Sequence, residues 1–254
     1  MEGLLSAMQQ RPGLYVAASS LMFRVVHRLL QTLPRPKVVE QDAFRAWKWR
    51  NLSVSLVHSL LTGSWAIACV IFWPEMLHQI YATFTPFSYQ LICVSTGYFV
   101  QDACDIIFSG YARGSWEFLL HHVMVIWCFL YALFTRHYVA GAVIALFVEV
   151  NSVFLHTRLM LKLAGLQSSP LFTLNKFLNL FTYVAFRLSA QFYLTWYIVH
   201  NYSWLDHGGF FLATMVLMNT MILIYFYRLL RADFFSSRTS HHPVHNGSTK
   251  FLKD

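Results

Sequence analysis

The amino-acid sequence predicts an all-α fold, a multi-pass transmembrane helical bundle with six strong spans and a weaker N-terminal one. Of the 254 residues, 57% are hydrophobic and only 12% are charged, about half the charged share of an ordinary soluble domain. Long apolar segments recur along the chain, and the basic residues gather in alternate connections. So few charges argue against a soluble enzyme, a secreted domain and a disordered regulator.

The spans are predicted from length, because a helix needs about 20 mostly apolar residues to cross a bilayer. The six strong segments are 52–72, 87–108, 117–134, 138–155, 177–199 and 209–230. The segment 13–33 is weaker, since Arg24, His27 and Arg28 interrupt it. We interpret it as a retained first helix rather than a signal peptide, because basic residues follow its apolar stretch and no small-residue cleavage site comes after it.

The basic residues predict the orientation. One alternating set of connections, together with the C-terminal segment, carries 16 Lys and Arg residues; the other carries only Arg11 and Arg136, and Arg187 lies inside a span. The positive-inside rule therefore places the basic connections and the C-terminus in the cytosol. We expect three regions: an N-terminal helix with a basic cytosolic connection (1–45), the membrane domain (46–233) and a disordered cytosolic tail (234–254).

Motifs for soluble chemistry are lacking in the sequence. The four cysteines lie in apolar stretches and form no CxxC pair, so we expect free thiols rather than a disulfide framework. No GxSxG, P-loop or GxGxxG pattern occurs, and no HExxH spacing accompanies the histidines. We therefore expect no metal and no cofactor, and no nucleic acid as partner.

Ionisable residues inside a span are costly and mark candidate functional sites. We predict His121, His122, Asp102 and Asp105 as the catalytic group, because a histidine beside a carboxylate is the arrangement of a general base. Asp102 and Asp105 are three residues apart and share one helix face. The predicted lipid-binding residues are His58, Gln101, Glu149, Asn151, Arg187 and Gln191. Their similar predicted depth suggests one shared cavity that opens toward the cytosol.

Packing is the alternative interpretation of the same residues. Polar side chains inside membranes also hold helices together through hydrogen bonds, which is our interpretation of Ser95, Asn219 and Thr220. Arg187 either belongs to the site or pairs with Glu149 or an aspartate and locks two helices. Neighbouring residues on a helix point about 100° apart, so only one of His121 and His122 is expected to face a given ligand.

Several stretches between residues 46 and 233 resemble the TLC-domain family of TRAM, LAG and ceroid-lipofuscinosis proteins. They are GYFVQDACDIIFSG (97–110), SWEFLLHHVM (115–124), FVEVNSVFLHTRLMLK (147–162), FRL (186–188) and YFYRLLRADF (225–234). An Asp-bearing span followed by a His-His pair at the start of the next span is the most specific of these features. The opening WKWRNLSVSLVHSLLTG and the segment NSVFLHTR resemble the small subgroup that includes calfacilitin.

The resemblance implies a role in lipid metabolism. Ceramide synthases of the family are acyl-CoA-dependent N-acyltransferases that use the His-His pair, here His121 and His122. They also carry a His-Asp doublet and further acids on a later helix, where this chain has Val148, Glu149, Ser152 and His156. Because one acid remains, ceramide synthesis itself is not expected. The calfacilitin-like subgroup implies control of phospholipid acyl composition and membrane fluidity.

Three functions therefore stand as hypotheses. The first is a lipid-homeostasis protein that binds phospholipid or fatty-acyl chains and limits polyunsaturated chains in phospholipids such as phosphatidylethanolamine. The second is an acyltransferase that takes acyl-CoA from the cytosol. The third is a non-enzymatic channel modulator or scaffold. The chain ends in KFLKD, which is neither a dilysine nor an HDEL-like retrieval signal, so we predict the plasma membrane, with the endoplasmic reticulum as the alternative.

The orientation can be tested by glycosylation. Asn201-Tyr202-Ser203 lies in a predicted outside connection, and Asn246-Gly247-Ser248 lies in the predicted cytosolic tail. We expect no glycan on Asn246, so the Asn246→Gln variant should match the wild type in glycosidase-sensitive gel mobility. A glycan on Asn246, measured with Asn201→Gln as control, would contradict the orientation.

Overall fold

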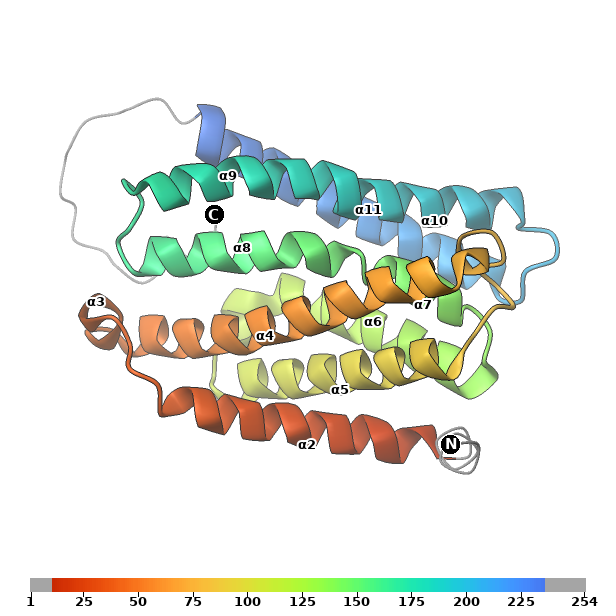
Figure 1. Ribbon diagram of the computed structural model, residues 1–254, viewed down its shortest axis with the longest axis horizontal. Coiled ribbons are helices and arrows are strands. Elements are labelled where there is room, and N and C mark those ends of the chain that lie inside the picture. The colour runs from red at the N-terminus through yellow and green to blue at the C-terminus, as the bar shows by residue number, and fades with distance from the viewer. Residues whose placement is uncertain (1–10, 236–254) are drawn as a thin grey trace.

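The computed structural model describes residues 11–235, which form a bundle of helices that run side by side along the long axis (Figure 1). The N-terminal half comprises α2 (Pro12–Gln31), α3 (Lys37–Glu40), α4 (Ala43–Phe72), the 3-10 helix η1 (Pro74–Leu77), α5 (Pro86–Phe108), η2 (Ala112–Ser115) and α6 (Trp116–Thr135). The C-terminal half comprises α7 (Val139–Ala145), α8 (Val148–Leu163), α9 (Pro170–Thr182), the π-helical turn η3 (Tyr183–Leu188), α10 (Ser189–His200), α11 (Gly208–Leu230) and η4 (Arg231–Phe235). No strand occurs among these residues.

Five helical segments of the described chain are long and apolar enough to cross a membrane: Ala43–Phe72, Pro86–Phe108, Ala112–Thr135, Val139–Leu163 and Gly208–Phe235. The all-α, multi-pass prediction is thus confirmed. The predicted span 138–155 proves longer, because α7 and α8 continue one another to Leu163 across a break at Leu146 and Phe147. The predicted spans 13–33 and 177–199 correspond to α2 and to part of the continuous α9–η3–α10 rod.

The helix starts follow from local sequence. The Asp42 carboxylate accepts a hydrogen bond from Phe44 N at 2.8 Å and caps α4. Thr85 and Ser88 form a reciprocal capping box at the start of α5, where Pro86 occupies the first turn. Ser169 caps α9, again ahead of a proline. These caps fix the residue at which each helix begins. They therefore help to determine which side chains of neighbouring helices lie at the same height along the bundle.

Two ends of the bundle can be distinguished. The basic end holds the connections 32–42, 109–115 and 164–169 and the end of α11; the aromatic end holds the connections 73–85, 136–138 and 201–207. Arg158 of α8 forms a bidentate ion pair with Asp233 at the basic end. Tyr81 donates a hydrogen bond of 2.6 Å to Asp206 at the aromatic end. Of the predicted tail, only residues 234 and 235 are described, and Asn246 lies outside the described residues.

Helix α2 packs directly on α5 at the edge of the bundle (Figure 1). Gly97 makes this contact possible. A Cβ at this position would lie 2.5 Å from Ser19 Cβ and 2.7 Å from Ser20 N, and part of the obstruction is helix backbone that cannot rotate away. Small residues at helix crossings allow such close approach in membrane proteins. The N-terminal helix is therefore packed into the bundle rather than appended to it.

We predict that Gly97→Ala destabilises the protein, because α2 must move away from α5. The expected loss in the free energy of unfolding is about 1–3 kcal/mol, the usual range for overpacking. Gly13→Ala is the matched control on α2, since nothing lies within 4 Å of a Cβ there. Thermal unfolding of both variants in one detergent measures the effect. Equal unfolding midpoints for Gly97→Ala and Gly13→Ala would show that the packing of α2 on α5 does not depend on this contact.

Candidate functional site

The His122–Asp102 pair is the shortest histidine–carboxylate contact among the described residues. His122 Nε2 of α6 lies 2.8 Å from Asp102 Oδ2 of α5, and both side chains are less than 10% exposed. His122 Nδ1 lies 2.6 Å from the carbonyl oxygen of Phe118 and can only donate there. A neutral imidazole has a single N–H. With Nδ1 donating to Phe118, Nε2 is the ring nitrogen that faces Asp102, and the 2.8 Å contact is an ion pair when the ring is protonated.

Helix α4 completes the surroundings of both aspartates. Asn51 Nδ2 donates a hydrogen bond of 2.5 Å to Asp102 Oδ1, and Trp47 Nε1 donates one of 2.9 Å to Asp105 Oδ2. On the other side, His27 Nε2 of α2 lies 3.7 Å from Asp105 Oδ1. The spacing of three residues does place both carboxylates on one face of α5. That face meets α4 and α2.

A second polar group lies deeper in the bundle, between α4 and α8. Ser59 donates a hydrogen bond of 2.6 Å to Glu149 Oε2, and His58 Nδ1 lies 3.8 Å from the same oxygen. The His58 ring is fully buried and stacks on Tyr98, with the ring centroids 3.7 Å apart. Along the helices, this group lies about 21 Å from the basic end and Asp102 about 9 Å. The polar residues thus occupy two levels rather than a single one.

Arg187 locks α8 to the π-helical turn. Its Nε donates to Asn151 Oδ1 at 2.8 Å, and its Nη2 donates to Ser152 Oγ at 2.8 Å. Asn151 Nδ2 in turn donates to Asn179 Oδ1 at 2.9 Å. The described hydrogen bonds of Arg187 thus go to neutral partners, not to Glu149 or an aspartate. A π-helical turn widens the helix locally, and here that turn contains the arginine.

Two predicted site residues point elsewhere. His121 Nδ1 lies 3.4 Å from Met218 Sδ, and Gln191 Nε2 donates toward Met215 Sδ at 3.2 Å, so both face α11. The adjacent histidines are therefore divided between two surroundings. His122 faces the acids on α5, whereas His121 faces a methionine. The expected convergence of all ten residues on one point does not occur.

The cavity beside Asp102 and Asp105 is small. It has a volume of about 10 Å³ and is bounded by α2, α4 and α5, with Gln101 and His27 in its wall. A volume of this size holds about one water molecule. This cavity is not the shared one expected from the sequence, because His122, Glu149 and Arg187 are not among its lining residues. Use of His122 as a base would require a substrate to displace Asp102 or Phe118 from a ring nitrogen.

Sequence reasoning missed the contribution of α4. Trp47, Asn51, Ser55 and Ser59 follow one another at intervals of four residues and form a stripe that faces the acids of α5 and α8. Ser55 accepts a hydrogen bond of 2.8 Å from Tyr98. The signal was present, since a spacing of four defines one helix face. The predicted span began at residue 52, which left Trp47 and Asn51 outside the helix to which they belong.

The comparisons with known proteins agree with this architecture. The family model described as TLC domain matches residues 48–231. TLC domain-containing protein 1 of Mus musculus is 41% identical over 236 residues, covering 93% of this chain and 94% of the relative. The Gallus gallus protein of that name is 42% identical, covering 87% and 88%. TLC domain-containing protein 2 of Danio rerio is 40% identical, covering 84% and 86%. By the extent of this match and by its helical bundle, the chain belongs to the TLC-domain family.

Proposed function

We propose that this protein regulates the acyl composition of membrane phospholipids and thereby membrane fluidity, limiting polyunsaturated chains in phospholipids such as phosphatidylethanolamine. The observation that carries the proposal is the buried His122–Asp102 pair inside an apolar bundle. Burying ionisable side chains in such surroundings costs free energy. Mere packing does not require them, because apolar side chains fill the same space at lower cost.

The lipid contact would be made by α6 and α11, which belong to the two least buried of the five candidate spans. On α6, Val123 and Trp127 are more than 60% exposed, and on α11 Tyr227 is 63% exposed. Acyl chains of neighbouring phospholipids are the natural partners of these faces. His121 and Gln191 contact Met218 and Met215 of α11 on the inner side of this helix, where Met218 and Gln191 are buried. In this proposal the protein acts in the plasma membrane, with the endoplasmic reticulum as the alternative, and keeps its C-terminus in the cytosol.

Acyl transfer is the second candidate, favoured by the 2.8 Å contact between His122 and Asp102. A carboxylate holds the imidazole in one orientation, as a general base requires. Acyl-CoA would be the donor and would approach from the basic end, where positive charge attracts its phosphates. Where ceramide synthases carry a His-Asp doublet and further acids, this chain has only one acid, Glu149 on α8. A sphingoid base, the acceptor in ceramide synthesis, is therefore not the expected acceptor here.

A lipidomic comparison tests the proposal. Cells lacking the endogenous protein are restored with wild type or with His122→Ala, matched for abundance. We expect the wild type to lower the polyunsaturated share of phosphatidylethanolamine and His122→Ala to have no such effect. The double variant His121→Ala/His122→Ala should be equally inactive. The single variant His121→Ala shows whether the lipid effect depends on His121 as well as on His122.

The controls distinguish function from folding. Removing one partner of a buried ion pair costs about 3–5 kcal/mol, because the other charge stays unpaired. The double variant His122→Asn/Asp102→Asn removes both charges and should be better folded than His122→Ala or Asp102→Ala, each of which removes only one partner. If folded His122→Ala still shifts the phospholipids as the wild type does, the pair is a packing contact and the proposal is wrong.

Acyl transfer has its own assay. Purified protein in nanodiscs is given acyl-CoA with a lysophospholipid or a lipid amine, and release of free CoA is measured. The acyltransferase hypothesis predicts CoA release that depends on the acceptor and is lost in His122→Ala. Absence of CoA release with every acceptor would leave regulation by binding as the explanation of any lipidomic effect.

A further inference from the structure

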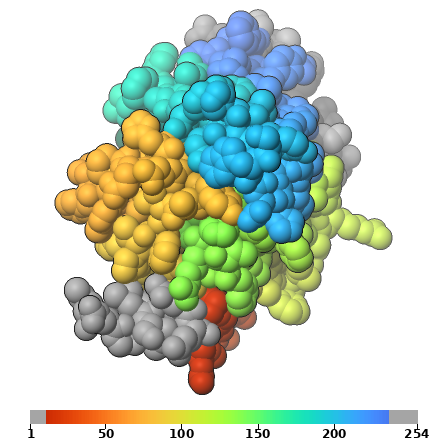
Figure 2. All heavy atoms as spheres, turned by 90° about the vertical axis from the view of Figure 1, so that its right-hand side faces the viewer, coloured from red at the N-terminus to blue at the C-terminus, as the bar shows by residue number. Residues whose placement is uncertain are grey.

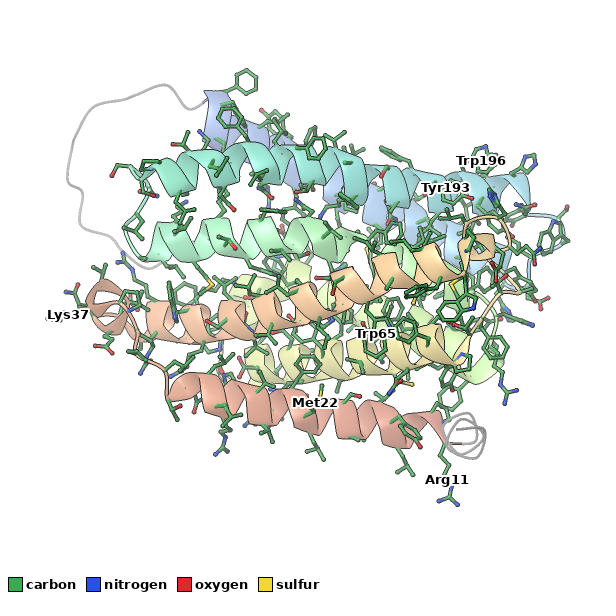
Figure 3. The ribbon with its side chains drawn as sticks, in the orientation of Figure 1. Arg11, Met22, Lys37, Trp65, Tyr193 and Trp196 are labelled. Carbon is green, nitrogen blue, oxygen red and sulfur yellow. The ribbon has the colours of Figure 1, made fainter. Side chains whose placement is uncertain are left out.

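A cleft of about 430 Å³ lies at the aromatic end, between the 73–85 connection and the last turns of α10. Figure 2 looks onto this end of the bundle, and Figure 3 shows Tyr193 and Trp196 extending from α10 there. Aromatic rings make most of its wall: Tyr81, Tyr193, Trp196, Tyr197, His200 and Trp204. The cleft lies at the opposite end of the bundle from the His122–Asp102 pair. A role for the cleft is therefore independent of the proposed function.

The rings are held in place by the protein itself. The Tyr193 hydroxyl donates a hydrogen bond to the Leu77 carbonyl and joins α10 to η1. Trp196 stacks on Tyr193 and on His200, with centroid distances of 5.9 and 5.3 Å. Trp204 donates to Asn201 Oδ1 at 3.2 Å. Little ordering is left for a ligand to impose, and such preorganisation favours binding.

The electrostatics of the cleft favour a cation. None of the described residues that line it is a lysine or an arginine. The Tyr81 hydroxyl donates to Asp206 at 2.6 Å and accepts from His137 Nδ1 at 2.9 Å. The hydrogen bond to Asp206 raises the pKa of Tyr81 to about 12, so the phenol stays neutral at physiological pH. A carboxylate behind the wall and the negative faces of several rings both attract positive charge.

The cleft differs from an ordinary belt of interfacial tryptophans and tyrosines, which anchor a protein without enclosing a volume. Tyr197 is 7% exposed and forms part of the buried wall, whereas Trp196 is 57% exposed and stands at the rim. Trp204 meets Tyr81 edge to face at 5.5 Å, whereas Trp196 lies nearly parallel to Tyr193 and His200, so the lining rings differ in orientation. This arrangement suits a compact apolar cation.

We propose that this aromatic cleft binds a trimethylammonium group, as carried by choline compounds. Such a group has no N–H to donate, so ring faces suit it better than hydrogen-bond acceptors do. A primary ammonium group donates three hydrogen bonds and is expected to bind less well. The site faces the side that the positive-inside rule places outside, where both a lipid head group and a soluble choline compound have access.

Equilibrium binding of radiolabelled phosphocholine to the full chain in phosphatidylglycerol nanodiscs tests the proposal. We expect saturable binding that tetramethylammonium displaces and that phosphoethanolamine displaces at least about tenfold less well. Displacement by inorganic phosphate but not by tetramethylammonium would identify an anion site and overturn the proposal. Equal competition by phosphoethanolamine, or no saturable binding, would overturn it as well.

The variants Trp196→Ala and Trp204→Ala should each weaken binding about tenfold. Both side chains are more than half exposed, so their loss leaves the core intact. Trp116→Ala is the matched control, because Trp116 is 60% exposed at the start of α6 and does not line the cleft. Size-exclusion profiles confirm that the variants are folded. Unchanged binding in both cleft variants would refute the site.

A further arm identifies the source of the group. The binding measurement is repeated in nanodiscs of phosphatidylcholine. If the lipid head group reaches the cleft, phosphatidylcholine suppresses phosphocholine binding in the wild type. If only a soluble choline compound reaches it, binding is the same in both nanodiscs. Either result supports the trimethylammonium site, and the difference between them names its physiological source.

Discussion

Burial of ionisable side chains in an apolar bundle is the constraint on which the rest of this structure depends. A carboxylate that is removed from water must find a partner, and the partner must come from another helix. Asp102 takes His122 from α6 and Asn51 from α4, and Glu149 takes Ser59 from α4. These bonds fix which helices are neighbours and at which level. The candidate site and the frame of the bundle are therefore the same set of interactions.

Helix shape adapts to these interactions. Gly97 removes the side chain where α2 crosses α5, which brings His27 within reach of Asp105. The π-helical turn at Tyr183–Leu188 contains Arg187, whose guanidinium reaches two neutral partners on α8. Such departures from regular geometry occur where the polar residues meet. These local adjustments allow regular helices to supply hydrogen-bond partners for buried polar side chains.

The two ends of the bundle differ in chemistry. At the basic end, charged pairs such as Arg158–Asp233 and Arg228–Glu117 tie helices together. At the aromatic end, tyrosine and histidine rings around Asp206 join three connections and leave the cleft beside α10. This division gives the molecule two candidate sites at opposite ends of the bundle, which can be tested independently.

The sequence by itself determined the helical class and the family resemblance and singled out His122 and Asp102 as candidates, because apolar length and the cost of buried charge are readable from residue types. It also placed Asp102 and Asp105 on one face. Tertiary structure alone decided the partners. The rotation of α6 decides that His122, and not His121, meets Asp102. The packing of α4 against α5 decides that Trp47 and Asn51 belong to its helix and face the aspartates. Those quantities arise from contacts distant in sequence, such as the 58 residues that separate Trp47 from Asp105.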